Sequence, residues 1–382
     1  MDGSNLQPDR RWRPSIEAVG GVLLAVASIA ALVLASSPWA QWYASICTWP
    51  IVIAVDSQVV ELTPTLIVNE GAMTLFFLTV GLEIRRELHA GELADPRRAA
   101  LPVAAALGGM IAPALIYAAF NPGGEAARGW GVPMATDIAF ALGALALLGR
   151  HASPAVRVLL LSLAIVDDVG SVLVIAVVYS DAIVPRWLPL ILIGVVLTLA
   201  MRRNGVRSPL LFVLPGATLW FGLLHSGVHP TLAGVVMGLL TPPSECERLQ
   251  SRLHPWVTLA IVPAFAFLNA GVALEWPVAE PQVAMGVALG LLVGKPVGII
   301  ATCSIAIRLR LVGSSSSLGW REITVVGLLA GVGFTVALFV AEIAFAEAGM
   351  LSSAKAGIVA ASSLAMVLAA IAGRFLLRTA PR

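Results

Sequence analysis

The sequence is poor in charge, which argues against an ordinary soluble fold. Only 12% of its 382 residues are Asp, Glu, Lys or Arg, about half the charged fraction of a typical soluble domain. Its three cysteines, Cys47, Cys246 and Cys303, are scattered without CxxC spacing, so neither a disulfide framework nor a zinc site is indicated. No GxxxxGK[ST] loop occurs, so no ATP-binding module of that type is indicated. We expect no cofactor and no nucleic-acid partner.

Long apolar runs take the place of charge. Hydrophobic residues make up 58% of the chain and the mean hydropathy is +0.91, which is typical of a polytopic membrane protein. We predict one all-α transmembrane domain over residues 16–376, between short tails at 1–15 and 377–382. The first run follows three arginines like a signal peptide, but its length of about 20 residues favours a retained helix. The twelve predicted spans are 16–36, 66–84, 98–120, 129–149, 155–178, 187–201, 209–223, 227–241, 255–274, 284–307, 322–344 and 353–376.

The distribution of basic residues supports this count. With the N-terminus in the cytoplasm, 20 of the 24 Lys and Arg residues fall in cytoplasmic segments. Only Arg128, Arg186 and Lys355 fall in outer loops, and Lys295 lies within a span. Cytoplasmic loops of membrane proteins carry an excess of Lys and Arg, so both termini are predicted to be cytoplasmic.

The first outer loop, at about 47–65, differs from the others. Two β-branched runs flank the polar residues 56–58, a pattern that predicts a β-hairpin. An isolated hairpin is marginally stable and leaves its edges open. We therefore hypothesise that it pairs with a second protomer; the alternative, packing against its own protein, stays open.

Two adjacent acids, Asp167 and Asp168, lie in the middle of the apolar run from Pro154 to Tyr179. A carboxylate at the centre of a spanning helix is costly unless water, a cation or a partner relieves it, and such residues mark ion pathways. The alternative is a pair of acids hydrogen-bonded between helices. We interpret the pair as the candidate ion site.

Two other spans place polar residues at the same depth. Pro133 precedes Thr136 and Asp137, and because proline removes a helix hydrogen bond, we expect opened backbone there. Lys295 lies in the tenth span, and glycines interrupt the eleventh at 331–333. Opened backbone at membrane depth is tolerated where it is buried in protein or lines a cavity.

These pieces form two corresponding triplets of spans, at about 98–178 and 284–376. The middle span of each is interrupted, and the two run in opposite directions through the membrane. This is the inverted-repeat arrangement of secondary transporters, which bind ions at the breaks. We predict that Asp137 offsets the positive N-terminal ends of the broken helices and that Lys295 offsets the negative C-terminal ends. Direct ion binding by these two residues is the alternative.

At these residues the chain resembles the NhaA-type sodium/proton antiporters, from about Val68 to Gly373. The resemblance is specific because seven motifs occur in order. They are Val80-Gly81-Leu82-Glu83, Ala135-Thr136-Asp137-Ile138-Ala139-Phe140, Ala164-Ile165-Val166-Asp167-Asp168, Gly227-Val228-His229, Leu253-His254-Pro255-Trp256, Gly294-Lys295-Pro296 and Gly331-Val332-Gly333-Phe334-Thr335.

The resemblance implies twelve helices in the bacterial inner membrane and a homodimer joined partly through the hairpin. It implies electrogenic exchange of sodium or lithium for protons, switched on at alkaline pH, in pH and sodium homeostasis. Asp167 and Asp168 would carry the ions, with Asp168 the main ligand. Asp137 and Lys295 would support the broken helices, and Lys295 would pair with Asp167 in one state.

Three further residues are candidates for pH response or ion access. The resemblance favours an access role for Glu83 over a simple interfacial salt bridge. His229 has a natural pKa suited to a pH switch, but it lies near a helix start, where packing is the alternative. His254 matches the family, whereas Gln250 and Ser251 stand where members can have Glu and His. The resemblance therefore covers the transport site but not these two positions, which are linked to the pH response.

The chemistry suits sodium, a hard cation that prefers oxygen ligands. Asp167 and Asp168 supply carboxylates, and Thr136 or opened backbone supplies neutral oxygens. Adjacent helix residues point about 100° apart, so the two carboxylates should not be equivalent, and the pair should titrate as a coupled unit. Two rivals are weaker: an intramembrane aspartyl protease leaves Lys295 unexplained, and a passive cation channel needs no titrating pair.

Overall fold

The computed structural model describes residues 16–377 apart from 56–57, 149–152, 181–182, 207, 274–277 and 312–317. Within these residues nine helical segments are long and apolar enough to cross a membrane, or ten when one bent pair is counted as a span. The prediction of an all-α membrane protein is confirmed, and the count of twelve stays a prediction. The tails at 1–15 and 378–382, with their arginines, and Arg150 and Arg207 lie outside the described residues.

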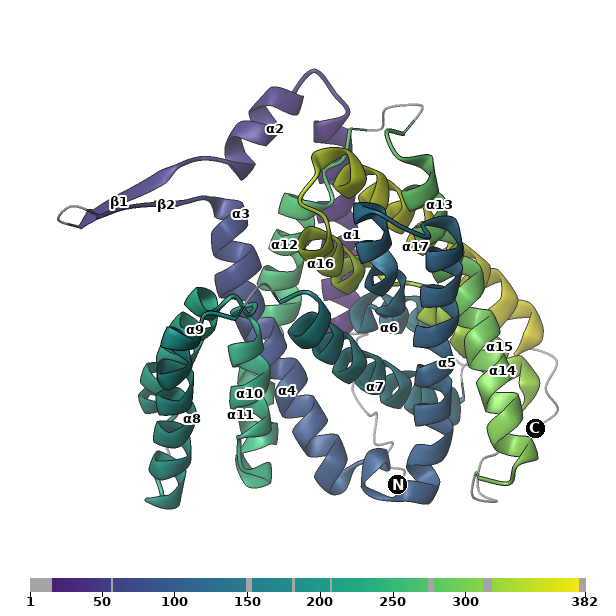
Figure 1. The fold of residues 1–382 in the computed structure, drawn as a ribbon. Coiled ribbons are helices and arrows are strands. Elements are labelled where there is room, and N and C mark those ends of the chain that lie inside the picture. The colour runs from purple at the N-terminus through teal and green to yellow at the C-terminus, as the bar shows by residue number, and fades with distance from the viewer. Residues whose placement is uncertain are drawn as a thin grey trace, which may run out of the picture.

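The long segments are single helices or helices joined end to end (Figure 1). They are α1 (Ile16–Ala35), α3–η1–α4 (Pro64–Leu66, Ile67–Ala72, Met73–Ala90), α5 (Pro96–Phe120), α7 (Pro154–Val178), η5–α8 (Pro185–Trp187, Leu188–Arg203), η6–α9 (Pro209–Phe212, Val213–Ser226), α11–η7–α12 (Pro243–Trp256, Val257–Ile261, Val262–Asn269), α13–η8–α14 (Pro281–Leu289, Gly290–Gly294, Lys295–Arg308) and α17 (Ala348–Leu376). The shorter ones are α2 (Ala40–Cys47), η2 (Glu92–Ala94), η3 (Glu125–Met134), α6 (Ile138–Leu148), α10 (Leu232–Leu239), α15 (Trp320–Ala330) and α16 (Phe334–Ala344).

Three helices begin with the same local signal. A capping side chain accepts a hydrogen bond from a backbone N–H of the first turn, and a proline follows it at once: Thr63–Pro64 in α3, Asp95–Pro96 in α5 and Ser153–Pro154 in α7. Proline suits this position because its missing N–H would have had no partner there. These caps fix where the chain enters each helix.

Two of the prolines inside the long helical segments closely follow wider π turns. Pro263 follows η7 and Pro296 follows η8. A proline leaves the carbonyl four residues before it without its helix bond, and a π turn absorbs that disruption without ending the helix. The second of these turns leads directly into Lys295.

The span predicted at 255–274 is the second half of a longer segment. The helix begins at Pro243, because the polar stretch ahead of the apolar run is also helical. Hydropathy marks the part that is apolar and does not mark where the hydrogen-bonded helix starts. The helical segment therefore begins twelve residues before the predicted apolar span.

The two interruptions expected from the sequence coincide with breaks in the helices. The axes of α15 and α16 are bent by 46° across residues 331–333. The other break is more irregular: η3 is a 3₁₀ helix, residues 135–137 carry no helix, and α6 follows. The two breaks touch, since the Asp137 N–H donates to the Val332 carbonyl oxygen at 2.7 Å.

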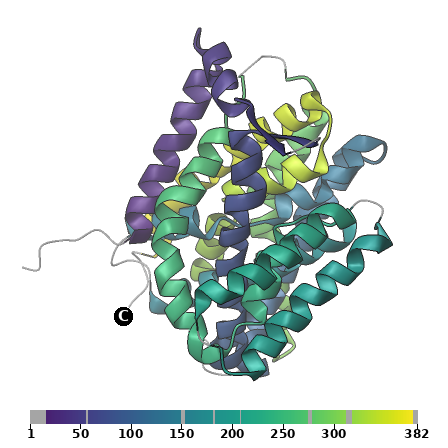
Figure 2. The ribbon, with the colours of Figure 1, turned by 90° about the vertical axis from the view of Figure 1, so that its left-hand side faces the viewer.

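Helices around the breaks pack closely. The α5 and α14 ribbons lie side by side in Figure 1, and a Cβ added at Gly298 would lie 2.0 Å from the carbonyl oxygen of Gly108. Only a residue without a side chain permits this approach. Figure 2 shows α8 and α9 packed together on the side of the bundle that faces the viewer.

The predicted hairpin is present. Strand β1 (Ile51–Val55) pairs antiparallel with β2 (Gln58–Leu62), and Val55 lies opposite Gln58. The prediction that Gln58 belongs to the turn is therefore wrong, because it pairs in the ladder. The strands project away from the helices in Figure 1. We call the end of the bundle that carries them the hairpin end.

The arginine-rich helix ends gather at the opposite end of the bundle. The C-terminal ends of α4, α8 and α14 all lie at this end in Figure 1. Arg85 and Arg86 lie one turn before the end of α4, and the last turns of α8 and α14 carry Arg202, Arg203 and Arg308. These five arginines, which the sequence analysis assigned to one side of a membrane, thus fall on one end of the molecule.

Candidate ion-binding site

The two acids of α7 are both buried. Asp167 is 0% exposed and Asp168 is 5% exposed. They lie near the middle of a 25-residue helix that packs against α4, α5 and α15. The structure brings the predicted residues Thr136, Asp137 and Lys295 to the same region, each of them also buried.

One oxygen of Asp167 is held by two partners. The Lys295 Nζ donates to Asp167 Oδ2 at 2.7 Å, and the Thr136 hydroxyl lies 2.7 Å from the same oxygen. Lys295 also donates to the Thr136 hydroxyl, which closes a three-membered polar cluster. The pairing of Lys295 with Asp167 that the resemblance implied is therefore present in this structure.

The second oxygen of Asp167 and both oxygens of Asp168 have no such partners among the described residues. Within the described part of the chain, Asp167 Oδ1 is buried and has no hydrogen-bond partner. Among the same residues no hydrogen bond to Asp168 is found, and the charges that act on it are those of Glu83, Asp167, Lys295 and Asp137. The two carboxylates are thus inequivalent.

Asp137 connects the two broken helices. Its Oδ2 accepts hydrogen bonds from the Thr335 N–H at 2.9 Å and the Thr335 hydroxyl at 2.5 Å, and its Oδ1 accepts from the Phe140 N–H at 3.0 Å. These donors lie in the first turns of α16 and α6, where backbone N–H groups carry partial positive charge. The carboxylate therefore lies at the N-terminal ends of the two helices that follow the breaks, as expected from the sequence.

Lys295 makes no direct hydrogen bond to the C-terminal end of α15, the helix that precedes one of the breaks. Its contacts are Asp167 and Thr136, and the Thr136 hydroxyl lies 3.2 Å from the carbonyl oxygen of Ala330, the last residue of α15. The hydrogen-bonded link between the lysine and that helix end therefore passes through the threonine.

The charge balance of the cluster favours binding of positive charge. Three buried carboxylates, Asp137, Asp167 and Asp168, face a single ammonium group, that of Lys295. Burying unpaired charge is expensive, and a cation or protons relieve it. No group of three or more His, Cys, Asp or Glu side chains among the described residues has the geometry to hold a resident metal ion.

The residues predicted for pH response or access lie outside this cluster. Arg86 pairs with Glu83 at 3.8 Å and donates to the Gln250 side-chain oxygen at 3.0 Å. His254 Nε2 lies 3.4 Å from a carboxylate oxygen of Glu17, and both side chains are about two-fifths exposed. Of the three candidates, only Glu83 is among the charges that act on Asp168.

His229 is packed and hydrogen-bonded. Its Nδ1 lies 2.8 Å from the Thr231 hydroxyl, and its ring meets the Phe339 ring edge to face at 5.1 Å. The side chain also lines a cavity of about 470 Å³ at the hairpin end, together with the charged residues Glu70, Arg128 and Glu342. The sequence analysis missed this cavity because its lining comes from segments far apart in the chain.

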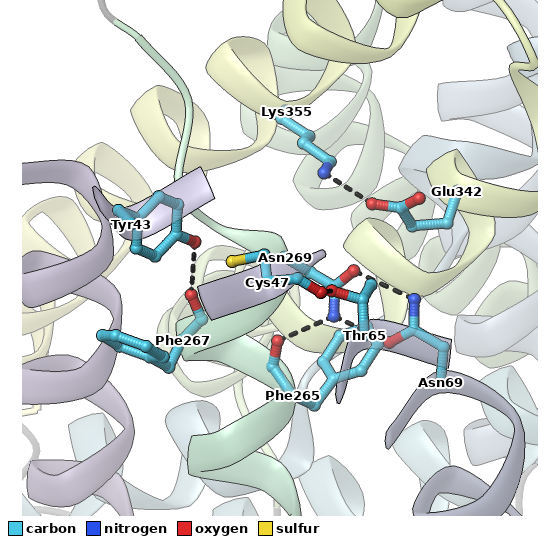
Figure 3. Close-up of polar contacts among 9 residues, drawn as sticks. All are labelled: Tyr43, Cys47, Thr65, Asn69, Phe265, Phe267, Asn269, Glu342 and Lys355. Atoms are coloured by element: carbon cyan, nitrogen blue, oxygen red, sulfur yellow. Dashed lines mark hydrogen bonds and ion pairs between the residues drawn. The ribbon is translucent and has the colours of Figure 1, made fainter. Parts of the chain in front are cut away.

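A network of polar contacts joins the segments at the hairpin end (Figure 3). The amides of Asn69 and Asn269 exchange two hydrogen bonds, at 3.0 and 2.8 Å. Lys355 pairs with Glu342 at 2.5 Å. These contacts tie the chain after the hairpin to α12 and tie α16 to α17.

The segment leading into the hairpin is anchored in the same network. The Tyr43 hydroxyl donates to the Phe267 carbonyl oxygen at 2.5 Å, and the Thr65 hydroxyl donates to the Cys47 carbonyl oxygen at 2.9 Å (Figure 3). Burial raises the pKa of the Cys47 thiol, since a low-polarity environment disfavours the thiolate. The strands thus project from a rigid base.

Comparison with known proteins identifies the family. Residues 14–372 match the family model described as Na+/H+ antiporter 1. A protein of Acidovorax sp. (strain JS42), named Na(+)/H(+) antiporter NhaA, is 46% identical over 95% of this chain and 91% of its own length. A protein of Myxococcus xanthus (strain DK1622), named Na(+)/H(+) antiporter NhaA 2, is 44% identical over 96% of this chain and 89% of its own length. The chain belongs to the Na+/H+ antiporter 1 family, and it is a transporter rather than an enzyme.

Proposed function

We propose that this protein exchanges sodium, or lithium, for protons across the bacterial inner membrane, and that Asp167 and Asp168 carry both ions. The observation that carries the proposal is the buried cluster in which Asp167 Oδ2 is held by Lys295 while Oδ1 and Asp168 have no hydrogen-bond partner among the described residues. Family membership supports the identity of the ions.

The exchange rests on competition for the same oxygens. A sodium ion at the free carboxylate oxygens satisfies the negative charge of the cluster, and so do protons. Because both cannot occupy the same oxygens, binding of one displaces the other. Thr136 is placed to supply a neutral oxygen, and the acids titrate together as a coupled unit.

We propose that the Lys295–Asp167 ion pair distinguishes the sodium-bound site from the site without sodium. While sodium is absent, its ammonium group neutralises Asp167, which keeps one buried charge paired. When sodium binds the carboxylates, the lysine loses its electrostatic partner. We propose that this competition couples cation binding to release of the Lys295–Asp167 pair and to the switch between inward- and outward-facing states.

Our proposal for the architecture is twelve spans with both termini cytoplasmic and inverted repeats at 98–178 and 284–376. The contact between the breaks at Asp137 and Val332 supports it. We also propose a homodimer through the hairpin, whose strands project from the helices, a physiological role in pH and sodium homeostasis, and lipid contacts around the bundle.

For pH response, we propose that the charged network of Glu83, Arg86 and His254 lies on the route of the ion at the arginine-rich end. The electrostatic effect of Glu83 on Asp168 supports this assignment. Gln250 accepts a hydrogen bond from Arg86 where relatives can present an acid. A neutral amide there holds the arginine without adding a titrating group.

The test uses everted membrane vesicles with a pH-sensitive dye, with sodium added between pH 6.5 and 9. We expect sodium-dependent dequenching for the wild type and none for Asp168→Asn. The exposed Glu125→Gln, the same acid-to-amide change outside the cluster, is expected to match the wild type. Absence of sodium-dependent proton movement at every pH, with folded protein in the membrane, would overturn the proposal.

A further inference from the structure

A buried hydroxyl lies one helical turn beyond the acid pair on α7. Ser171 is 4% exposed, and within the described part of the chain its Oγ has no hydrogen-bond partner. Leaving such a group unpaired costs about 1–3 kcal/mol. Native structures retain groups of this kind where a ligand, an ion or a water satisfies them.

Serines in the helices of this protein ordinarily satisfy themselves. Ser28 and Ser304 each donate to the carbonyl oxygen four residues earlier, the usual arrangement for a helical serine. Ser171 departs from that arrangement although its helix is continuous from Pro154 to Val178. Its hydroxyl is therefore available for another partner.

Helix geometry places this residue on the same face of α7 as the acids. At 100° per residue, position 171 lies about 40° around the helix from Asp167 and about 60° from Asp168, so it falls between them. Along the axis it is about 6 Å from the first and about 4.5 Å from the second. The side chains of all three residues tilt toward the N-terminus of the helix, so the tilt leaves this spacing along the axis unchanged.

The other buried helix hydroxyl without a partner among the described residues, Ser362, lacks this setting. It lies on α17, and no acid lies within four residues of it on either side. Ser171 alone of the two has acids at both the third and the fourth position before it. Asp167 Oδ1 lies on the same helix and also has no hydrogen-bond partner among the described residues.

We propose that Ser171 is a neutral oxygen ligand of the transported cation, completing a site whose charged ligands are Asp167 and Asp168. This assignment rests on the proposed function. A hard cation prefers several oxygen ligands, and a hydroxyl oxygen adds one without adding charge. Because serine does not titrate, it strengthens cation binding without strengthening proton binding at the same atom.

The test compares cation binding and exchange for Ser171→Ala and Ser171→Cys. Purified protein is assayed for radioactive sodium binding, and proteoliposomes are assayed for exchange rate against sodium concentration. We expect both variants to raise the half-saturating sodium concentration about fivefold, the size of one interaction with a neutral group. The maximal rate at saturating sodium and its pH midpoint should stay near the wild type, since the titrating groups are intact.

Two comparisons separate ligation from packing. Cysteine fills the space of serine but offers soft sulfur, so a packing role predicts that Ser171→Cys behaves as wild type, whereas ligation predicts that it behaves as Ser171→Ala. Ser162→Ala is the matched control, because Ser162 is equally buried on α7 but lies about 170° around the helix from the acid face. It should leave the sodium dependence unchanged.

The outcomes are distinguishable. Wild-type sodium dependence in Ser171→Ala or in Ser171→Cys overturns this inference, and the proposed function stands if Asp168→Asn is inactive in the same preparation. Absence of sodium-dependent proton movement in the wild type itself overturns the proposed function. Melting temperatures of both variants are measured beside the wild type, and a changed maximal rate with unchanged half-saturation also contradicts a ligand role.

Discussion

Replacing Asp137 should cost more stability than replacing Asp168, although the two acids are similarly buried. Asp137→Ala leaves the Thr335 and Phe140 backbone N–H groups without their acceptor. Each buried unpaired N–H costs about 1–3 kcal/mol, so the expected loss is about 2–6 kcal/mol. Asp137→Asn keeps one acceptor oxygen and should lose about half as much. Asp168→Asn removes no hydrogen bond to the described residues and should change stability least.

The assay is thermal unfolding in detergent with a dye that fluoresces on reaction with thiols. The three cysteines are free and buried, so they become reactive only when the fold opens. We expect the melting temperature to fall in the order wild type, Asp168→Asn, Asp137→Asn, Asp137→Ala. An Asp137→Ala protein that melts with the wild type would refute the view that this carboxylate holds the two helix starts together.

Three further predictions follow from contacts in the bundle. Lys295→Ala should destabilise the protein by about 3–5 kcal/mol because it leaves the Asp167 charge buried without its partner; adding Asp167→Asn should restore part of the melting temperature, and a further loss would contradict the pairing. Gly298→Ala should lower the melting temperature because its Cβ would lie 2.0 Å from an α5 carbonyl oxygen, while Gly143→Ala, which meets no atom within 4 Å, should not; equal effects would show that this close approach is unimportant. The raised pKa of Cys47 keeps its thiol protonated at pH 7.5, so a maleimide should label native protein slowly and unfolded protein quickly, as mass spectrometry of that peptide can show.

The acids and the breaks could be predicted because each is energetically unfavourable within its own apolar segment. A carboxylate in an apolar run, or a proline and glycines in a span, is unfavourable in itself, and Asp167, Asp168 and the interruption before Asp137 are therefore visible in the sequence alone. The prediction that the two acids are inequivalent needed only the helical repeat. These elements required no knowledge of which helices are neighbours.

The contact partners of these groups could not be predicted from the residues around them in the sequence. The sequence puts Lys295 at the right depth, but its contact with Thr136 depends on how three helices cross. The Asn69–Asn269 amide pair joins positions 200 residues apart, and no pattern in either segment indicates the other. The start of α11 was missed for a different reason, since its first turns are polar and hydropathy does not register them.

Ser171 lies between these two cases. Its spacing from the acids is visible in the sequence, as the residue three and four positions beyond them on one helix. What marks it is the lack of a carbonyl partner among the described residues, since a helical serine is otherwise expected to bond its own backbone. Only the structure supplies that observation.

The most direct test of the account is proton release on sodium binding by the purified protein in weakly buffered detergent, followed with a pH dye. Competition for the Asp167–Asp168 carboxylates predicts that sodium releases protons from the wild type, with an amount that depends on pH, and that Asp168→Asn releases none. Sodium binding without proton release at any pH, or release from Asp168→Asn equal to that of the wild type, would contradict the claim that the two ions share one site.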